Sequence, residues 1–150
     1  MNTYAERYHL KSAAAWLRGH AMKTGAPEID PELLDKRVTF LNELSAGGYS
    51  QLTAYNKNIC GQPFPENSFD VVTLLEVLEH IPEVGKAVEA AVKMARKYVV
   101  VSVPSKEDDN PEHIHLLTKD ILTRLFADAG CTKLHFSGVN GHLIMMATIE

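Results

Sequence analysis

Hydrophobic residues in the second half of the chain form two kinds of pattern: short continuous runs, and a series spaced every three or four residues. Phe69–Leu75 is a short apolar run rich in β-branched residues, and Pro, Asn and Ser precede it. Such a run is typical of a strand buried on both faces. Tyr98–Val103 repeats the pattern and stops at Pro104. We therefore predict two buried strands.

Between these runs the apolar positions recur every three or four residues. This spacing predicts an amphipathic helix, and Pro82 lies near its first turn, where the missing N–H costs little. Strand, helix and strand predict a right-handed βαβ unit with parallel strands. The loop Glu76–Ile81 then lies at the carboxyl end of the sheet, where open α/β sheets bind ligands. The predicted apolar face comprises Val84, Ala87, Val88, Ala91, Val92 and Ala95.

A further helix and a hairpin are predicted toward the C-terminus. Thr118 has the character of a helix N-cap, and Gly130 would end the helix. Cys131–Ser137 and His142–Ile149 indicate two strands, and the Asn-Gly pair within Gly138–Gly141 is a strong hairpin turn. The helix residues expected to point inward are Ile121, Leu122, Leu125 and Phe126.

Residues 1–48 indicate a helical N-terminal segment of the same domain. One helix is predicted over Met1–Met22, and a second begins with Asp30 as its N-cap. Gln51–Asn58 alternates weakly and is polar, which favours an edge strand. We thus expect a single domain of 150 residues, with a sheet core over 51–150.

Composition narrows the classes of function. The formal net charge is −4 at pH 7, which argues against a generic nucleic-acid or membrane-surface binder. No stretch approaches the roughly 18 apolar residues of a membrane helix, and no signal-peptide pattern begins the chain. Cys60 and Cys131 match no metal or redox motif and are interpreted as free thiols. We therefore expect a cytoplasmic protein.

The central stretch also carries a family resemblance. PFPENSFDVVTLLEVLEHIPE, followed by VVVSVP, resembles the second half of class I S-adenosylmethionine-dependent methyltransferases, from about Asn58 to the C-terminus. The resemblance implies an α/β fold: a reduced Rossmann-like methyltransferase sheet, with a βαβ unit, a C-terminal antiparallel hairpin and a helical N-terminus. It also implies S-adenosylmethionine as cofactor and a methyl acceptor, a small molecule or another compound, that no motif identifies.

The resemblance assigns cofactor contacts to five positions. Asn58 replaces an Asp that accepts a hydrogen bond from the adenine amino group in relatives, and Ile59 would present its backbone N–H to the ring. The region of Leu75 and Glu76 would line the sulfonium side of the pocket. His80 would order the loop, either beside the cofactor or through a purely structural hydrogen bond to the loop backbone.

Candidate catalytic groups lie in the same region. Methyl transfer depends mainly on positioning and desolvating the nucleophile, and a base helps when the acceptor must lose a proton. Glu76, His113 and His115 are the candidate bases, although the two histidines could equally belong to a solvated loop.

A metal site is the alternative interpretation of these residues. Glu76, Glu79 and His80, together with His113 or His115, resemble the magnesium site of small-RNA 3′-terminal 2′-O-methyltransferases. The same EVLEH motif occurs in metal-free relatives, so we predict no metal and keep Glu76, Glu79, His80 and His113 as the alternative set.

One part of the family pattern is missing. The expected glycine-rich turn after a first strand has no counterpart, because the glycines at 47 and 48 follow a helix-like segment and are better explained as its end. The chain thus resembles a truncated methyltransferase. It is either an enzyme whose pocket is completed by the N-terminal helices or a partner chain, or a degenerate relative without cofactor that acts as a scaffold or partner module. An unrelated α/β enzyme is the remaining interpretation.

The missing first strand has a structural consequence. It would leave Phe69–Leu75 with an open edge, which invites pairing with another chain. We expect either that Gln51–Asn58 covers this edge or that the protein forms a homodimer through it.

Overall fold

The computed structural model divides into two compact units, residues 1–56 and 57–150, which are described separately. In the first unit, Asn42 exchanges two hydrogen bonds with the backbone of Ala54, at 2.9 and 3.2 Å. The described residues of the second predicted helix (39–40, 42–43 and 46) are helical; the first predicted helix, Asp30 and the glycines at 47–48 lie outside the described residues. The structure describes residues 39–40, 42–43, 46, 53–55, 57–107 and 109–150.

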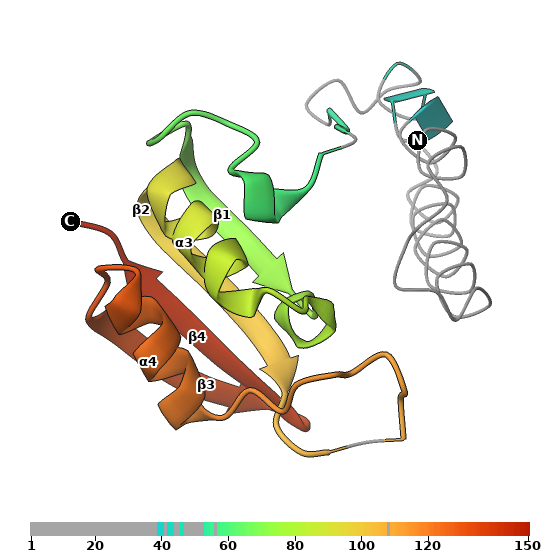
Figure 1. The fold of residues 1–150 in the computed structure, drawn as a ribbon, viewed down its shortest axis with the longest axis vertical. Coiled ribbons are helices and arrows are strands. Elements are labelled where there is room, and N and C mark those ends of the chain that lie inside the picture. Colours follow the sequence, from blue (N-terminus) through green and yellow to red (C-terminus); the bar gives the residue numbers. More distant parts are fainter. Residues whose placement is uncertain (1–38, 41, 44–45, 47–52, 56, 108) are drawn as a thin grey trace, which may run out of the picture. The chain divides into compact units, whose positions relative to one another are not determined.

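The second unit is built on a four-stranded mixed sheet with the order β1-β2-β4-β3 (Figure 1). β1 (Phe69–Leu75) pairs in parallel with β2 (Ala95–Pro104). β4 (His142–Thr148) runs antiparallel to both β2 and β3 (Lys133–Val139). This topology confirms the predicted parallel βαβ unit and the C-terminal hairpin.

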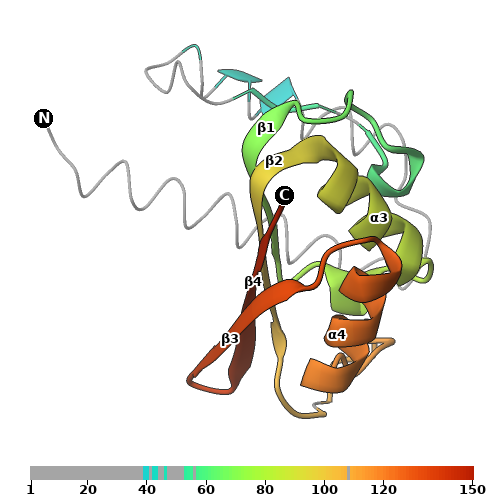
Figure 2. The ribbon, with the colours of Figure 1, turned by 90° about the vertical axis from the view of Figure 1, so that its left-hand side faces the viewer.

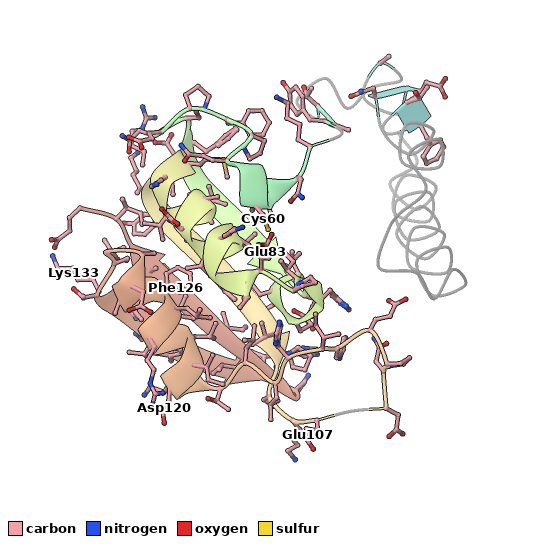
Figure 3. The ribbon with its side chains drawn as sticks, in the orientation of Figure 1. Cys60, Glu83, Glu107, Asp120, Phe126 and Lys133 are labelled. Atoms are coloured by element: carbon pink, nitrogen blue, oxygen red, sulfur yellow. The ribbon has the colours of Figure 1, made fainter. Side chains whose placement is uncertain are left out.

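Two helices cover the same face of the sheet, as Figure 2 shows in an edge-on view. They are α3 (Val84–Met94), which connects β1 to β2, and α4 (Lys119–Asp128), which precedes β3. The short 3-10 helix η1 (Ile59–Gly61) lies against α3, where Cys60 Sγ is 3.9 Å from the Glu83 carbonyl oxygen (Figure 3). A second 3-10 helix, η2 (Leu78–His80), follows β1.

The predicted apolar face of α3 is the face that packs on the sheet. Ala87, Val88 and Ala91 are fully buried, and Val84 and Val92 pack partly buried against the core. Ala95, predicted as a helix position, is instead the first residue of β2. The helix therefore passes directly into the strand without a loop.

The ends of α4 also agree with the sequence. The Thr118 hydroxyl accepts a hydrogen bond from the Ile121 N–H at 3.4 Å, as an N-cap does. Gly130 adopts a φ of +86°, and the Cys131 N–H then donates to the Phe126 carbonyl at 2.8 Å. One inward position was predicted wrongly: Ile121 is 38% exposed, because the contact with the sheet is made by Leu122 and Phe126.

The prediction that both strands are buried on both faces is wrong for the described structure. Along β1 only Leu74 is buried, while Val71 and Leu75, on the opposite face, are 46% and 54% exposed. In β2, Val101 is fully buried and Tyr98 is 38% exposed. The reason is that α3 and α4 lie on one side, so within residues 57–150 the other side of the sheet has no helix over it.

The hairpin and the sheet edge differ in detail from expectation. The turn is the two-residue Asn140-Gly141, with φ of 45° and 88°, and β3 begins and ends two residues later than predicted. Residues 53–55 and 57–58 are not strand, so the described part of Gln51–Asn58 does not cover the edge of β1. Among the described residues β1 pairs only with β2. No helix of the described residues is long and apolar enough to span a membrane.

Candidate functional site

The carboxyl end of β1 carries a backbone irregularity at Glu76. This residue has a φ of +54°, which a side chain with a Cβ adopts at a cost of about 1–2 kcal/mol. Its N–H donates to the Ser102 carbonyl at 2.9 Å, which continues the pairing with β2 by one residue. The conformation turns the chain out of the sheet at the edge where α/β folds bind ligands.

The Glu76 carboxylate is held by the two neighbouring strands. The Ser102 hydroxyl donates to Oε1 at 2.6 Å, and His142 Nδ1 lies 3.2 Å from Oε2. Ser102 lies between the buried Val101 and Val103, so it belongs to the sheet face opposite the helices. The Glu76 side chain is 40% exposed, so it is both oriented and accessible to a ligand.

A second group of polar side chains surrounds η2. Glu79 is fully buried, and its burial raises the pKa of the carboxyl group. His80 Nε2 lies 3.7 Å from Glu79 Oε1, and His113 joins them so that one ligand atom from each residue lies within 4.8 Å of the others. The structure therefore places Glu79, His80 and His113 together, without Glu76.

The loop after β2 is fastened to η2 by three polar contacts. The Ile114 N–H donates to the Glu79 carbonyl at 3.0 Å, and His80 Nδ1 lies 2.9 Å from the Glu112 carbonyl oxygen. His115 Nε2 lies 3.1 Å from the Ile81 carbonyl oxygen. The structural hydrogen bond expected for His80 is thus present. His115 is half-buried rather than solvated, as is His113, because the loop lies against η2.

The remaining predicted cofactor positions fall on two elements. Asn58 is the N-cap of η1, and its Oδ1 accepts a hydrogen bond from the Cys60 N–H at 2.9 Å. Ile59 opens the same helix and packs partly buried against the core. Leu75, the last residue of β1, is exposed. An adenine contact by Asn58 would therefore use the second lone pair of Oδ1 or the side-chain NH₂ group, neither of which the helix cap uses.

The sequence did not identify two residues at this edge, Ser102 and His142. Alternation along β2 could have separated Ser102 from its buried neighbours, and its position near the strand end was a usable signal. No local signal exists for His142, since it reaches Glu76 only through the antiparallel register that sets it opposite Pro104.

A cavity elsewhere in the fold does not belong to this site. It has a volume of about 160 Å³ and adjoins Cys131, Thr148 and Val92, at the end of β4 farthest from His142. Burial raises the pKa of the Cys131 thiol, whose Sγ lies 3.3 Å from the Thr148 carbonyl oxygen. Sites for drug-sized ligands measure about 300–1,000 Å³, so this cavity is too small for a nucleoside cofactor.

A parallel βαβ unit closed by an antiparallel hairpin, with its polar residues at the carboxyl edge, defines a Rossmann-like methyltransferase sheet. Solved methyltransferases share this fold. A putative methyltransferase from Bacillus halodurans has 14% identity and a TM-score of 0.59, over 80% of each chain. A SAM-dependent methyltransferase from Aquifex aeolicus has 18% identity and a TM-score of 0.59, over 82% of this chain and 66% of that one.

Magnesium protoporphyrin IX methyltransferase from Synechocystis, solved with bound SAH, has 13% identity and a TM-score of 0.60, over 77% of this chain and 61% of its own. Residues 12–101, more than half of the chain, match the family described as methyltransferase domain, and the chain belongs to that family. The match begins at residue 12, so the expectation that the resemblance starts near Asn58 is wrong. No curated protein matches the sequence.

Proposed function

We propose that this protein is an S-adenosylmethionine-dependent methyltransferase whose reaction takes place at the carboxyl edge of β1 and β2. Two observations carry the proposal. Glu76 has a left-handed backbone conformation and a carboxylate held by the Ser102 hydroxyl, and the chain belongs to the methyltransferase-domain family. A positive φ at a non-glycine residue persists only where the surrounding structure enforces it, and such strained residues are frequent at functional sites. The structural relatives support the fold, and the transfer reaction is our inference from the site.

In this proposal the cofactor contacts are those given by the resemblance. Asn58 and Ile59 receive the adenine ring at the start of η1, and Leu75 and Glu76 line the side of the reacting methyl group. His80 orders the loop through the Glu112 carbonyl. A second copy of the chain would complete the pocket on the side where the described residues 57–150 supply no glycine-rich turn.

The protein's part in the chemistry is positioning and proton removal. The cofactor supplies an electrophilic methyl group: its bond to sulfur breaks as a bond to the acceptor forms. Glu76 accepts the proton that an oxygen or nitrogen acceptor loses, because it is exposed, while Ser102 and His142 fix its orientation. His115 is less suited because its Nε2 is engaged with the Ile81 carbonyl, and His113 because its Nδ1 is buried.

A homodimer through β1 forms part of the proposal. Within the described residues the outer edge of β1 has no strand partner, and FDVVTLL contains neither Pro nor Lys, the residues that commonly block edge pairing. Pairing of two β1 edges would also bring together the exposed Val71 and Leu75 of both copies.

Titration calorimetry with S-adenosylmethionine and S-adenosylhomocysteine tests the function. We expect one site per chain, a rise in melting temperature with either ligand, and weaker binding in Asn58→Ala. The matched control is His135→Gln, which removes an exposed polar side chain from β3 and should bind as the wild type does. A folded protein that shows neither heat nor a thermal shift at millimolar ligand would refute the enzyme and favour a scaffold that has lost its cofactor.

A further inference from the structure

The Glu79 carboxylate is buried without a hydrogen-bond donor among the described residues, an arrangement that favours a positively charged partner. Its side chain is fully inaccessible to solvent, and neither oxygen receives a hydrogen bond from the described residues. Buried carboxylates in folded proteins are normally paired, hydrogen-bonded or bound to a metal. The nearest candidate, His80 Nε2, lies 3.7 Å from Oε1, which is too long for a hydrogen bond.

The orientation of His80 sharpens this point. Its Nδ1 lies 2.9 Å from the Glu112 carbonyl oxygen, and since a carbonyl only accepts, Nδ1 must carry a proton. In the neutral ring the lone pair is then on Nε2, the nitrogen that lies 3.7 Å from Glu79 Oε1. Metal-binding histidines commonly show this arrangement, with one ring nitrogen donating to a backbone carbonyl and the other left for the ion.

His113 supplies a third donor from a different part of the chain. Its ring packs edge-on against the His80 ring, with centroids 4.8 Å apart, and the three candidate ligand atoms lie within 4.8 Å of one another. Ligands around a tetrahedral zinc ion at about 2.1 Å stand roughly 3.4 Å apart. A contraction of up to about 1.4 Å, from 4.8 to roughly 3.4 Å, would therefore complete the set.

We propose that Glu79, His80 and His113 bind a divalent transition-metal ion, with zinc favoured over magnesium because two of the three donors are imidazoles. This set differs from the alternative considered from the sequence, because Glu76 is engaged with Ser102 and His142. The ion would tie the loop after β2 to η2, at the same place as the hydrogen bond from Ile114 to Glu79. The proposal goes beyond the proposed function and does not depend on it.

The test uses the full chain, freed of metal with a chelator and titrated calorimetrically with Zn²⁺ and Mg²⁺. We expect one zinc ion per chain, bound at least 100-fold more tightly than magnesium. His113→Gln should weaken zinc binding at least tenfold, in the range found when partners of a metal site are lost. His135→Gln removes an exposed imidazole on β3 and should leave zinc affinity unchanged. This control distinguishes the proposed site from nonspecific zinc binding by surface histidines.

A second variant keeps the proposal falsifiable if His113→Gln folds poorly. Glu79→Gln keeps the shape of the side chain, and we expect the metal-free variant to melt no lower than the wild type while its zinc-induced rise in melting temperature disappears. Hydrogen exchange of residues 109–118 should slow on zinc addition in the wild type only. The site is refuted if the wild type binds no zinc, or if Glu79→Gln and His113→Gln bind it as the wild type does. Cofactor titration is measured separately, so either proposal can fail while the other stands.

Discussion

Replacing Glu76 by Gly and by Ala provides the sharpest test of the candidate site. The residue has a φ of +54°, and its carboxylate accepts a hydrogen bond from Ser102. Both substitutions remove the carboxylate, but only glycine adopts a positive φ without a steric penalty. The difference between the two variants therefore isolates the cost of the backbone conformation from the loss of the side-chain contacts.

Opposing effects set the size of this difference. Glycine relieves roughly 1–2 kcal/mol of left-handed strain. Glycine also lowers the free energy of unfolding by about 0.4–1 kcal/mol relative to alanine, because it gives the unfolded chain more conformational freedom. The net expectation is that Glu76→Gly is about 0.8 kcal/mol more stable than Glu76→Ala, within a range of roughly 0–1.6 kcal/mol, the reverse of the usual order. In the Ala variant the lost hydrogen bond, discounted for its exposure, adds about 1 kcal/mol of destabilisation relative to the wild type.

Urea unfolding at pH 7 measures these differences, and Glu76→Gln serves as the matched control because its amide oxygen can still accept from Ser102. At this chain length about 1 kcal/mol corresponds to roughly 2–4 °C in melting temperature. All three variants should also lose methyl transfer if Glu76 is the base. An alanine variant more stable than the glycine variant by about 0.4–1 kcal/mol would show that the left-handed conformation is not strained, and the structural argument for this site would fail.

Two further predictions concern the opposite end and the edge of β1. The pKa of Asp70 is held below its usual range by hydrogen bonding to Arg96, so this carboxylate stabilises the folded state above the unfolded pKa and loses that effect as the pH falls through the lowered value. The stability difference between wild type and Asp70→Asn, followed by thermal melts, should therefore be largest near neutral pH and vanish in strong acid; a difference that grows on acidification would contradict the sign. Val71→Lys places a charge beside the open edge and should convert a dimer to a monomer in sedimentation or light scattering, whereas Thr123→Lys, on α4, should not. A wild type that is monomeric at high concentration would refute the dimer.

The local signals in the sequence predicted the elements well. Phe69–Leu75, the Thr118 cap and the Asn-Gly turn were placed correctly because each rests on neighbouring residues: a β-branched run, a hydroxyl before a helix, and two residues tolerant of positive φ. The exposure of β1 was predicted wrongly because an apolar run does not tell how many layers cover a sheet. That depends on where α3 and α4 pack, which no window of sequence contains.

The candidate site shows the same division. The sequence alone determined that Glu76 follows a strand and that Glu79 and His80 follow closely after it, so their place at the carboxyl edge was predictable. Only the tertiary structure decided how these groups are partnered. Antiparallel pairing brings His142 to Glu76, and the loop after β2 carries His113 to Glu79, across separations along the chain that local pattern does not encode. Propensity and capping act between neighbours, whereas register and loop docking are set by burial of the whole core, and this is why the partners of each carboxylate emerged only from the fold.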